Sequence, residues 1–282
     1  MSNNVLKMAC VLPLLGICGF ANAGELGFLG AAGLQYKQLK MEQSFKNVSA
    51  PIPGGDKGDL NASLPVLNLQ VISFYESFYA IGKAELSLAE DSADSSVPFT
   101  QGETSLSTDV KREDYSLVLG YKLNDTLSFF GGYMAGKTTL TPDHCSGCSN
   151  LASLMKDGGF GEYRQEYEEK GFFGGVSAGW NVAPGRIGAS IAYAIMDGKY
   201  SDNYRDALNT AEFDYEGDSK GLSAACSWTA PITETLFYFV DARIQQYSMD
   251  ASDKTGAAPF ENSSVKTDET IFGLAGGVQM LF

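Results

Sequence analysis

The C-terminal stretch Thr270-Ile-Phe-Gly-Leu-Ala-Gly-Gly-Val-Gln-Met-Leu-Phe282 decides the fold. Its residues alternate in character, as the two faces of a β-strand do. One face is mostly apolar and the other is mostly small or polar: the first holds Phe272, Leu274, Gly276, Val278, Met280 and Phe282, and the second holds Ile271, Gly273, Ala275, Gly277, Gln279 and Leu281. A strand that presents an aromatic terminal residue on its apolar face is typical of a barrel covered by lipid.

The N-terminus predicts export. A short region with one cation, Lys7, precedes an apolar stretch at Met8–Phe20 and the sequence Ala21-Asn22-Ala23. This is the pattern of a signal peptide with an A-x-A cleavage site. We therefore expect residues 1–23 to be removed and residues 24–282 to form a single barrel domain, beginning at Gly24.

Two other interpretations of the N-terminus are less favoured. A membrane-anchoring helix needs about 20 apolar residues, whereas this stretch is shorter and is interrupted by Pro13, Gly16 and Gly19. Lipoprotein processing would attach a lipid to Cys18, but the bulky Ile17 stands before it, where a small residue is expected.

The composition fits a membrane barrel without helices. The chain is 44% hydrophobic and has 32 glycines, yet residues 24–282 contain no apolar run long enough for a membrane-spanning helix. Only a closed sheet then satisfies every backbone polar group in lipid. The net charge of −14 argues against nucleic-acid binding, because that function requires a basic face.

The acidic residues concentrate between the apolar stretches. They gather at Glu90–Asp91, Asp94, Glu162–Glu169, Asp202–Asp218 and Asp250–Glu269. We expect solvated surface loops there. A more specific hypothesis is that divalent cations bridge these loops to anionic lipopolysaccharide.

Ten segments alternate with period two, so we expect an all-β, antiparallel up-and-down barrel of about ten strands; eight or twelve strands stay open because each signal is weak. The first nine segments are Leu26–Met41, Leu64–Ser73, Phe78–Leu88, Asp114–Leu123, Thr126–Thr138, Gly171–Val182, Arg186–Met196, Gly221–Trp228 and Thr235–Tyr247. The tenth is the C-terminal stretch. A soluble lipocalin-like barrel is the alternative, and it requires an apolar interior and a polar exterior.

The connections alternate in length. Short turns are predicted at Tyr75-Glu76, Asn124-Asp125, Ala183–Gly185 and Ala230–Glu234, and long polar loops at Glu42–Asn61, Glu90–Glu113, Leu140–Lys170, Lys199–Lys220 and Asp250–Glu269. Short periplasmic turns and long outer loops are typical of outer-membrane barrels. Trp180 and Trp228 both fall beside short turns, which predicts a periplasmic aromatic girdle.

The signal peptide, the alternating segments and the ending Gly273–Phe282 together resemble single-domain bacterial outer-membrane β-barrel proteins, of the porin-like or opacity-like kind. The resemblance implies a multi-pass protein of the outer membrane of Gram-negative cells. It also implies that the barrel assembly machinery reads the last strand at Phe282. Outer-membrane lipid and lipopolysaccharide are the expected surroundings, with a host or surface ligand also open.

Cys145-Ser146-Gly147-Cys148 lies in a predicted outer loop. Exported chains meet an oxidising compartment, so we expect a disulfide between Cys145 and Cys148. Such a bond closes a very short loop and would mainly fix local shape. A redox motif and a metal site that also uses Asp143 and His144 are the alternatives. Cys226 is expected on the lipid face as an inert small residue.

The lone histidine, His144, forms a His-x-Ser pattern with Ser146, with Asn150 nearby. Outer-membrane lipid hydrolases use a His and a Ser two residues apart on a strand, oriented by an Asn or an acid, because the imidazole must reach the hydroxyl. Here the pattern lies in a predicted loop, which disfavours that chemistry. A protease that pairs His144 with aspartates such as Asp143 is a weaker alternative.

Several charged residues are expected inside the barrel: Lys37, Lys83, Glu85, Asp114, Lys122, Asp241 and Arg243. They would form a charge network that fills a small lumen, or line a narrow channel. Barrels of about eight strands are filled by side chains, whereas open pores need roughly 16 strands. We therefore expect a non-enzymatic barrel with a structural or surface-interaction role and no cofactor or metal, with a narrow channel and a lipid hydrolase as alternatives.

Overall fold

The computed structural model describes residues 9–11, 17–19, 26–47, 57–96, 105–145, 162–205, 210–255 and 262–282. Strands β1 (Ala9–Val11) and β2 (Ile17–Gly19) pair with each other in an antiparallel sheet of their own. They lie in the segment for which the sequence predicts a signal peptide. In these ranges there is no helix of the length and apolar character that a membrane span requires.

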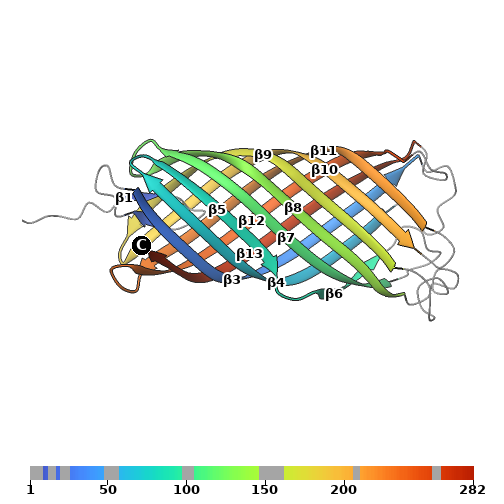
Figure 1. Ribbon diagram of the computed structural model, residues 1–282, viewed down its shortest axis with the longest axis horizontal. Coiled ribbons are helices and arrows are strands. Elements are labelled where there is room, and N and C mark those ends of the chain that lie inside the picture. Colours follow the sequence, from blue (N-terminus) through green and yellow to red (C-terminus); the bar gives the residue numbers. More distant parts are fainter. Residues whose placement is uncertain are drawn as a thin grey trace, which may run out of the picture.

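The other strands form one closed antiparallel barrel (Figure 1). They are β3 (Leu26–Lys46), β4 (Lys57–Tyr75), β5 (Phe78–Ser87), β6 (Asp91–Ser96), β7 (Ser105–Lys122), β8 (Leu127–Cys145), β9 (Glu162–Val182), β10 (Gly185–Arg205), β11 (Thr210–Pro231), β12 (Leu236–Asp253) and β13 (Ser264–Leu281). Both β5 and β6 lie between β4 and β7 and together make one interrupted strand. The wall therefore has ten strand positions, which confirms the predicted fold.

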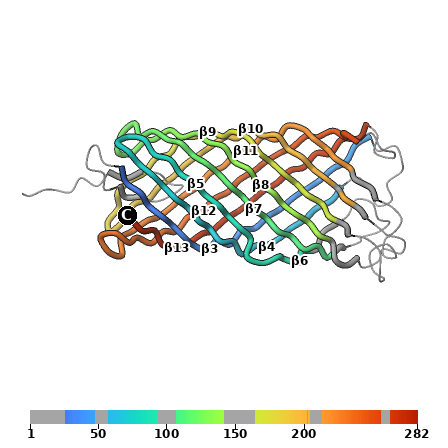
Figure 2. The backbone as a smooth tube through the Cα atoms, in the orientation of Figure 1, coloured from blue at the N-terminus to red at the C-terminus, as the bar shows by residue number. Residues whose placement is uncertain are grey.

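The barrel closes where the C-terminal strand meets the first wall strand. β13 pairs with β3 from Ser264↔Lys46 to Leu281↔Leu29. The backbone N–H of Phe282 donates a hydrogen bond to the carbonyl oxygen of Phe28 at 3.0 Å. The strands run obliquely to the long axis of the barrel (Figure 2). The last strand is thus paired on both sides, as closure requires.

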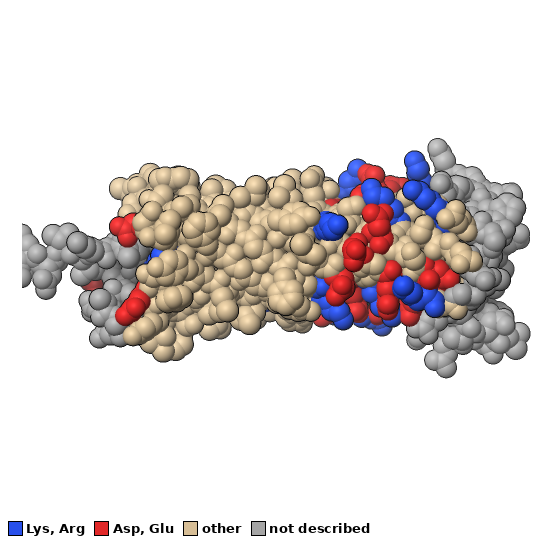
Figure 3. Space-filling model, turned by 90° about the horizontal axis from the view of Figure 1, so that it is seen from above, with Lys and Arg blue, Asp and Glu red and all other residues tan. Residues whose placement is uncertain are grey.

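An apolar band surrounds the end of the barrel at which the short turns lie. Figure 3 shows this band free of charged side chains, with lysines, arginines, aspartates and glutamates confined mainly to the other half. Exposed members include Phe28, Leu34, Leu69, Leu117, Leu119, Phe129, Phe172, Trp180, Ile191, Tyr193, Leu222, Val240, Phe272, Leu274 and Phe282. Such a ring of outward apolar side chains is where a barrel contacts lipid. The strands therefore cross the membrane at the short-turn end.

The strands continue well past this band, and here the expected boundaries were wrong. Apart from β5 and β6, each wall strand has 18 to 22 residues. Much of each predicted acidic loop is strand: the run Glu162–Glu169 lies in β9, and the run Asp202–Asp218 lies largely in β10 and β11. The outer half of the molecule is thus a continued barrel wall.

Where the wall leaves the apolar band, the apolar side chains change from the outer face of the strand to its inner face. The sequence prediction relied on an outer apolar face, so it ended the strands too early. On β3, Leu34 and Tyr36 are exposed while Lys37 is buried. A few residues later Leu39 and Met41 are buried, and their neighbours Lys40 and Glu42 are exposed. A strand in lipid is apolar outside, whereas a strand in water is apolar inside. The outer half therefore has the pattern of a barrel wall in water, and the short-turn half has that of a membrane barrel. The protein as a whole is an outer-membrane barrel, so the soluble lipocalin-like alternative is wrong.

Candidate functional site

The barrel interior holds a buried charge network at the level where the alternation inverts. Lys37 on β3 lies at its centre: its Nζ is 2.7 Å from Oε2 of Glu85 on β5 and 2.6 Å from Oδ2 of Asp114 on β7. The Lys37 side chain is only 2% exposed. An unpaired buried ammonium would be costly, so these two carboxylates stabilise it.

Arg112 extends the network across the barrel. Its Nε lies 3.0 Å from Oδ2 of Asp114 on the same strand, and its Nη1 lies 2.5 Å from Oε1 of Glu269 on β13. Nη1 also donates a hydrogen bond to the hydroxyl of Thr138 on β8 at 2.9 Å. Since β7 and β13 are not neighbours in the wall, this guanidinium joins separate parts of the barrel through the interior.

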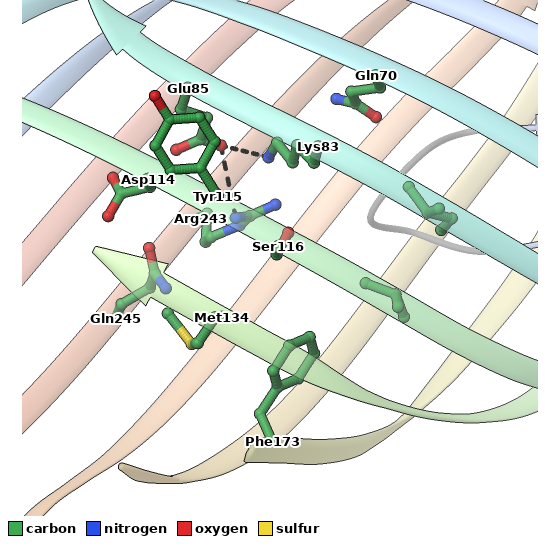
Figure 4. A pocket seen from close by; sticks show the side chains of 12 residues that line it. Gln70, Lys83, Glu85, Asp114, Tyr115, Ser116, Met134, Phe173, Arg243 and Gln245 are labelled. Atoms are coloured by element: carbon green, nitrogen blue, oxygen red, sulfur yellow. Dashed lines mark ion pairs between the residues drawn. The ribbon is translucent and has the colours of Figure 1, made fainter. Parts of the chain in front are cut away.

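A second arginine approaches from another side. Nη1 of Arg243 on β12 lies 3.7 Å from Oε1 of Glu85, and Nη2 lies 4.0 Å from Oδ1 of Asp241. Lys83 on β5 forms an ion pair with the same carboxylate of Glu85. Figure 4 shows Lys83 and Arg243 both directed at Glu85. This one carboxylate therefore binds cations carried by three different strands.

A small cavity lies beside this cluster. Its volume is about 70 Å³ and its lining includes Gln70, Lys83, Glu85, Met134 and Arg243 (Figure 4). Several buried polar atoms here form no hydrogen bond within the protein: Gln70 Oε1, Arg243 Nε and Arg243 Nη2. A polar cavity of this size has room for a few water molecules, which need such partners.

Apolar side chains fill the interior on both sides of the network. The cluster toward the short turns includes Leu29, Ile72, Phe74, Ile81, Val118, Phe130 and Phe239. The cluster in the outer half includes Leu39, Met41, Phe45, Leu64, Tyr200, Tyr215, Met249 and Val265. The rings of Phe45, Tyr200 and Tyr215 lie with centroids 5.9 to 6.2 Å apart. The described side chains thus occupy the lumen at three successive levels.

Three members of the network were missed by the sequence analysis. Arg112, Glu169 and Glu269 all fall in segments that were predicted as outer loops. Glu169 on β9 accepts hydrogen bonds from the hydroxyls of Tyr167, at 2.7 Å, and Ser219. These residues could have been found from the period-two alternation of apolar and polar residues. It continues beyond the predicted strand ends, but there the apolar residues lie on the inner face of the strand.

The predicted interior charges other than Lys122 meet in this network. Lys122 is the last residue of β7, next to a short turn. It is separated from Asp114 by almost half of the strand. The prediction grouped it with the others because it shares their face, and the structure places it toward the short-turn end.

The predicted loop chemistry lies mostly outside the described residues. β8 runs to Cys145, so the backbones of His144 and Cys145 belong to the end of a strand and not to a loop as expected. Their side chains, and the whole of Ser146, Cys148 and Asn150, lie outside the described part. The disulfide, the His-Ser pair and the metal alternative therefore stay predictions. Among described residues, no three or more His, Cys, Asp or Glu side chains form a metal-binding group.

The two tryptophans lie at one height near the short turns. Ile187 on β10 pairs with Trp180 on β9 and with Trp228 on β11. Trp228 Nε1 donates a hydrogen bond to the hydroxyl of Tyr238 at 3.2 Å. Amphipathic rings in this position suit the boundary between lipid and water.

Ion pairs cover the outer face of the wall above the apolar band. They include Lys40–Glu42, Lys111–Glu113, Lys137–Glu166, Arg164–Glu166, Lys199–Asp214 and Lys266–Asp268. Asp214 lies eight residues beyond Leu222, outside the membrane-spanning part of β11. Partial burial by itself raises the pKa of Asp214. Hydrogen bonds from Ser201 at 2.6 Å and Lys199 at 2.9 Å outweigh this and hold the pKa below its ordinary value.

Comparison with solved structures supports the barrel fold. The outer membrane protease OmpT from Escherichia coli superposes with a TM-score of 0.65 over 91% of this chain and 97% of its own, at 12% sequence identity. The chain has the fold of an outer-membrane β-barrel. The barrel also aligns with OprG from Pseudomonas aeruginosa at a TM-score of 0.43 and 15% identity, covering 92% of this chain and 96% of the other. No family model and no curated protein matches the sequence.

Proposed function

We propose that this outer-membrane β-barrel is a closed structural protein whose interactions take place on its outer half. The observation that carries the proposal is the filled interior: a buried charge network lies between two apolar clusters. An open pore requires a water-filled lumen, which larger barrels provide. A barrel of ten strand positions with such an interior therefore acts through its outer wall and does not conduct.

The outer wall supports a role in surface interaction. Its interior is packed with aromatic and aliphatic side chains, so the wall is rigid outside the membrane as well as inside it. Its outer face carries both charge signs in close pairs. A rigid, charged wall is suited to binding other surface components, because little conformational entropy is lost on contact.

Single-channel recording in planar lipid bilayers tests this proposal. We expect the purified barrel to give no steady conductance under conditions in which a 16-stranded porin, as positive control, conducts. A stable open state would overturn the proposal and favour the narrow channel, with Lys83, Glu85 and Arg243 as the residues that line its path.

Enzymatic activity is the remaining alternative, and our proposal is that the protein has none. The fold is shared with a protein named as a protease, but at 12% identity this likeness extends only to the fold. The hydrolase hypothesis depends on His144 and Ser146. Cleavage of phospholipid, lipid A or peptide by the wild-type protein, lost in Ser146→Ala or His144→Ala and kept in Ser149→Ala, would contradict the proposal. Wild-type protein without turnover agrees with it.

A further inference from the structure

The buried charge network holds one more carboxylate than it holds cations. Arg186 and Lys122 stand apart from it, at the short-turn ends of β10 and β7. A buried charge without a partner is costly, and a change of protonation usually removes it. The surplus therefore predicts that one carboxyl group of the network carries a proton. The described cations of the network are Lys37, Lys83, Arg112 and Arg243, and its described carboxylates are Glu85, Asp114, Glu169, Asp241 and Glu269.

The surplus lies at Glu169 and Glu269. Glu269 binds Arg112 through Oε1, which is 2.5 Å from Nη1, while its Oε2 is buried and forms no hydrogen bond. Glu169 accepts hydrogen bonds from the hydroxyls of Tyr167, at 2.7 Å, and Ser219. In the described part of the chain, Glu169 is the one carboxylate of the network that forms no ion pair. Both carboxylates act on the guanidinium of Arg112, so one cation serves two anions there.

The groups packed around this pair do not offset its charge. On β7, Arg112 is also bound to Asp114, and Lys37 on β3 is shared between Asp114 and Glu85. Burial raises the pKa of Tyr167 and of Tyr247, so both side chains keep their protons near neutral pH. The uncharged groups that border the pair are Met41 on β3, Thr138 on β8, Tyr167 on β9, Ser219 on β11 and Tyr247 on β12.

Both carboxyl groups lie outside the membrane-spanning segments. Glu269 is three residues beyond Phe272, the last exposed apolar residue of β13, and Glu169 is three residues beyond Phe172 on β9. Burial raises the pKa of Glu269 to about 7; Arg112 opposes this rise and Glu169 adds to it. Burial also raises the pKa of Glu169, against the hydrogen bonds that it accepts. Two carboxylates in one buried site repel each other, so the first proton belongs to the pair.

We propose that Glu169 and Glu269 together bind one proton, and that this proton makes the outer half of the barrel a pH-sensitive element. With the proton bound, the charges of the network balance and the wall above the membrane is firm. Release of the proton to solvent leaves an uncompensated negative charge between β7, β9 and β13, and the wall loosens. The proposal holds whether or not the outer wall binds a partner, because it concerns the interior alone.

The direction of the pH dependence follows from proton linkage. The pKa of the pair is higher in the folded barrel than in the unfolded chain, so folding takes up a proton. The stabilisation is therefore complete below the ordinary carboxyl pKa of 4.5 and is lost as the pH rises through about 7. Between these values the folding equilibrium constant should fall by up to roughly tenfold per pH unit, as expected for one bound proton.

Two measurements on the full barrel in nanodiscs test the proposal. Infrared spectroscopy should detect the C=O band of a protonated carboxyl group that titrates with a midpoint near pH 7, and denaturant-induced unfolding should show the fall in stability over the same range. Glu169→Gln and Glu269→Gln should each remove this band and flatten the stability curve, because either substitution removes the surplus charge. If one of these variants does not fold, the other gives the answer alone.

Matched controls separate this pair from other carboxyl groups. Glu168→Gln changes the neighbouring residue, whose side chain is 42% exposed on the outer face of β9. Asp241→Asn changes the other network carboxylate that has a buried oxygen without a hydrogen bond. Both controls should keep the band and the pH dependence.

Three results would overturn the proposal. The first is a wild type that has no such band or whose stability is constant across the range. The second is a band that persists in both Glu169→Gln and Glu269→Gln. The third is a band that disappears equally in a control variant.

Discussion

Arg112 Nη1 on β7 and Glu269 Oε1 on β13 lie 2.5 Å apart inside the barrel, although 157 residues separate them in the chain. Both side chains are almost completely buried. Buried charges of this kind are tolerated only when each has its partner. The pair thus joins distant strands at the level where the wall leaves the membrane.

Replacing Arg112 by methionine should lower the free energy of unfolding by about 3–5 kcal/mol, because it leaves the carboxylate of Glu269 buried without its cation. Denaturant-induced unfolding in detergent micelles, followed by the two tryptophans, measures the loss. The double variant Arg112→Met with Glu269→Gln should recover part of it.

Lys266→Met is the control for this prediction, since its pair with Asp268 is exposed. It should cost no more than about 1 kcal/mol. Equal losses for Arg112→Met and Lys266→Met would show that the network does not stabilise the barrel.

A charge placed in the apolar band should be costly. Leu119 on β7 is 61% exposed and lies in the band, so Leu119→Arg should destabilise the barrel in lipid bilayers by about 2–4 kcal/mol. Gln38→Arg, on the outer face of β3 beyond the band, should change the free energy by less than about 1 kcal/mol. The reverse order would mean that the membrane surrounds another part of the wall.

The outer half should behave as a folded core. Phe45 is buried against Tyr200 and Tyr215, and Phe45→Ala should cost about 3–5 kcal/mol, as other large-to-small core substitutions do. Hydrogen exchange should speed up in the outer parts of β10 and β11. If this region were solvated loops, the substitution would change the stability by less than about 0.5 kcal/mol.

Acidification should weaken the outer wall at Asp214. Its pKa is lowered in the folded protein, so its contribution is present above the ordinary carboxyl pKa and is lost as the pH falls through the lowered value. The pair with Lys199 lies on the outer face of the wall, where the side chains of Lys199 and Asp214 are 38% and 23% exposed, so the effect should be below about 1 kcal/mol. Stability curves between pH 7 and acid should be slightly flatter for Asp214→Asn than for the wild type, and identical curves would contradict this assignment.

The predicted bond between Cys145 and Cys148 can be counted chemically. Removal of the predicted signal peptide, residues 1–23, would leave Cys145, Cys148 and Cys226. Alkylation of the unfolded, unreduced mature protein should then modify Cys226 alone, and prior reduction should add the other two. Modification of all three without reduction would exclude the disulfide.

The fold could be predicted from the sequence because lipid imposes one rule on every strand that it surrounds. Wherever Leu, Val or Phe alternated with small or polar residues, as in β13, the strand and its faces were found. Outside the membrane the rule reverses: Leu39 and Met41 on β3 are buried inside the barrel. A search for apolar outward faces cannot follow a strand through this reversal.

The interior network could be predicted only in part for the same reason. Lys37, Glu85 and Asp241 belong to the part of the wall with the membrane pattern, and their common face was clear. Arg112 and Glu269 stand just beyond it, among residues whose high charge suggested loops. Their meeting across the lumen depends on barrel closure, which local sequence patterns do not encode.

The inverted alternation has a practical consequence. A detergent belt would cover only the short-turn half and leave a water-compatible cylinder standing roughly 25 Å beyond it, given the usual rise and tilt of strands. Because its packing is internal, this cylinder does not depend on detergent for its shape. It offers antibody fragments and crystal neighbours an ordered surface, and it makes cell-surface display of inserted peptides at its rim a realistic use of the protein.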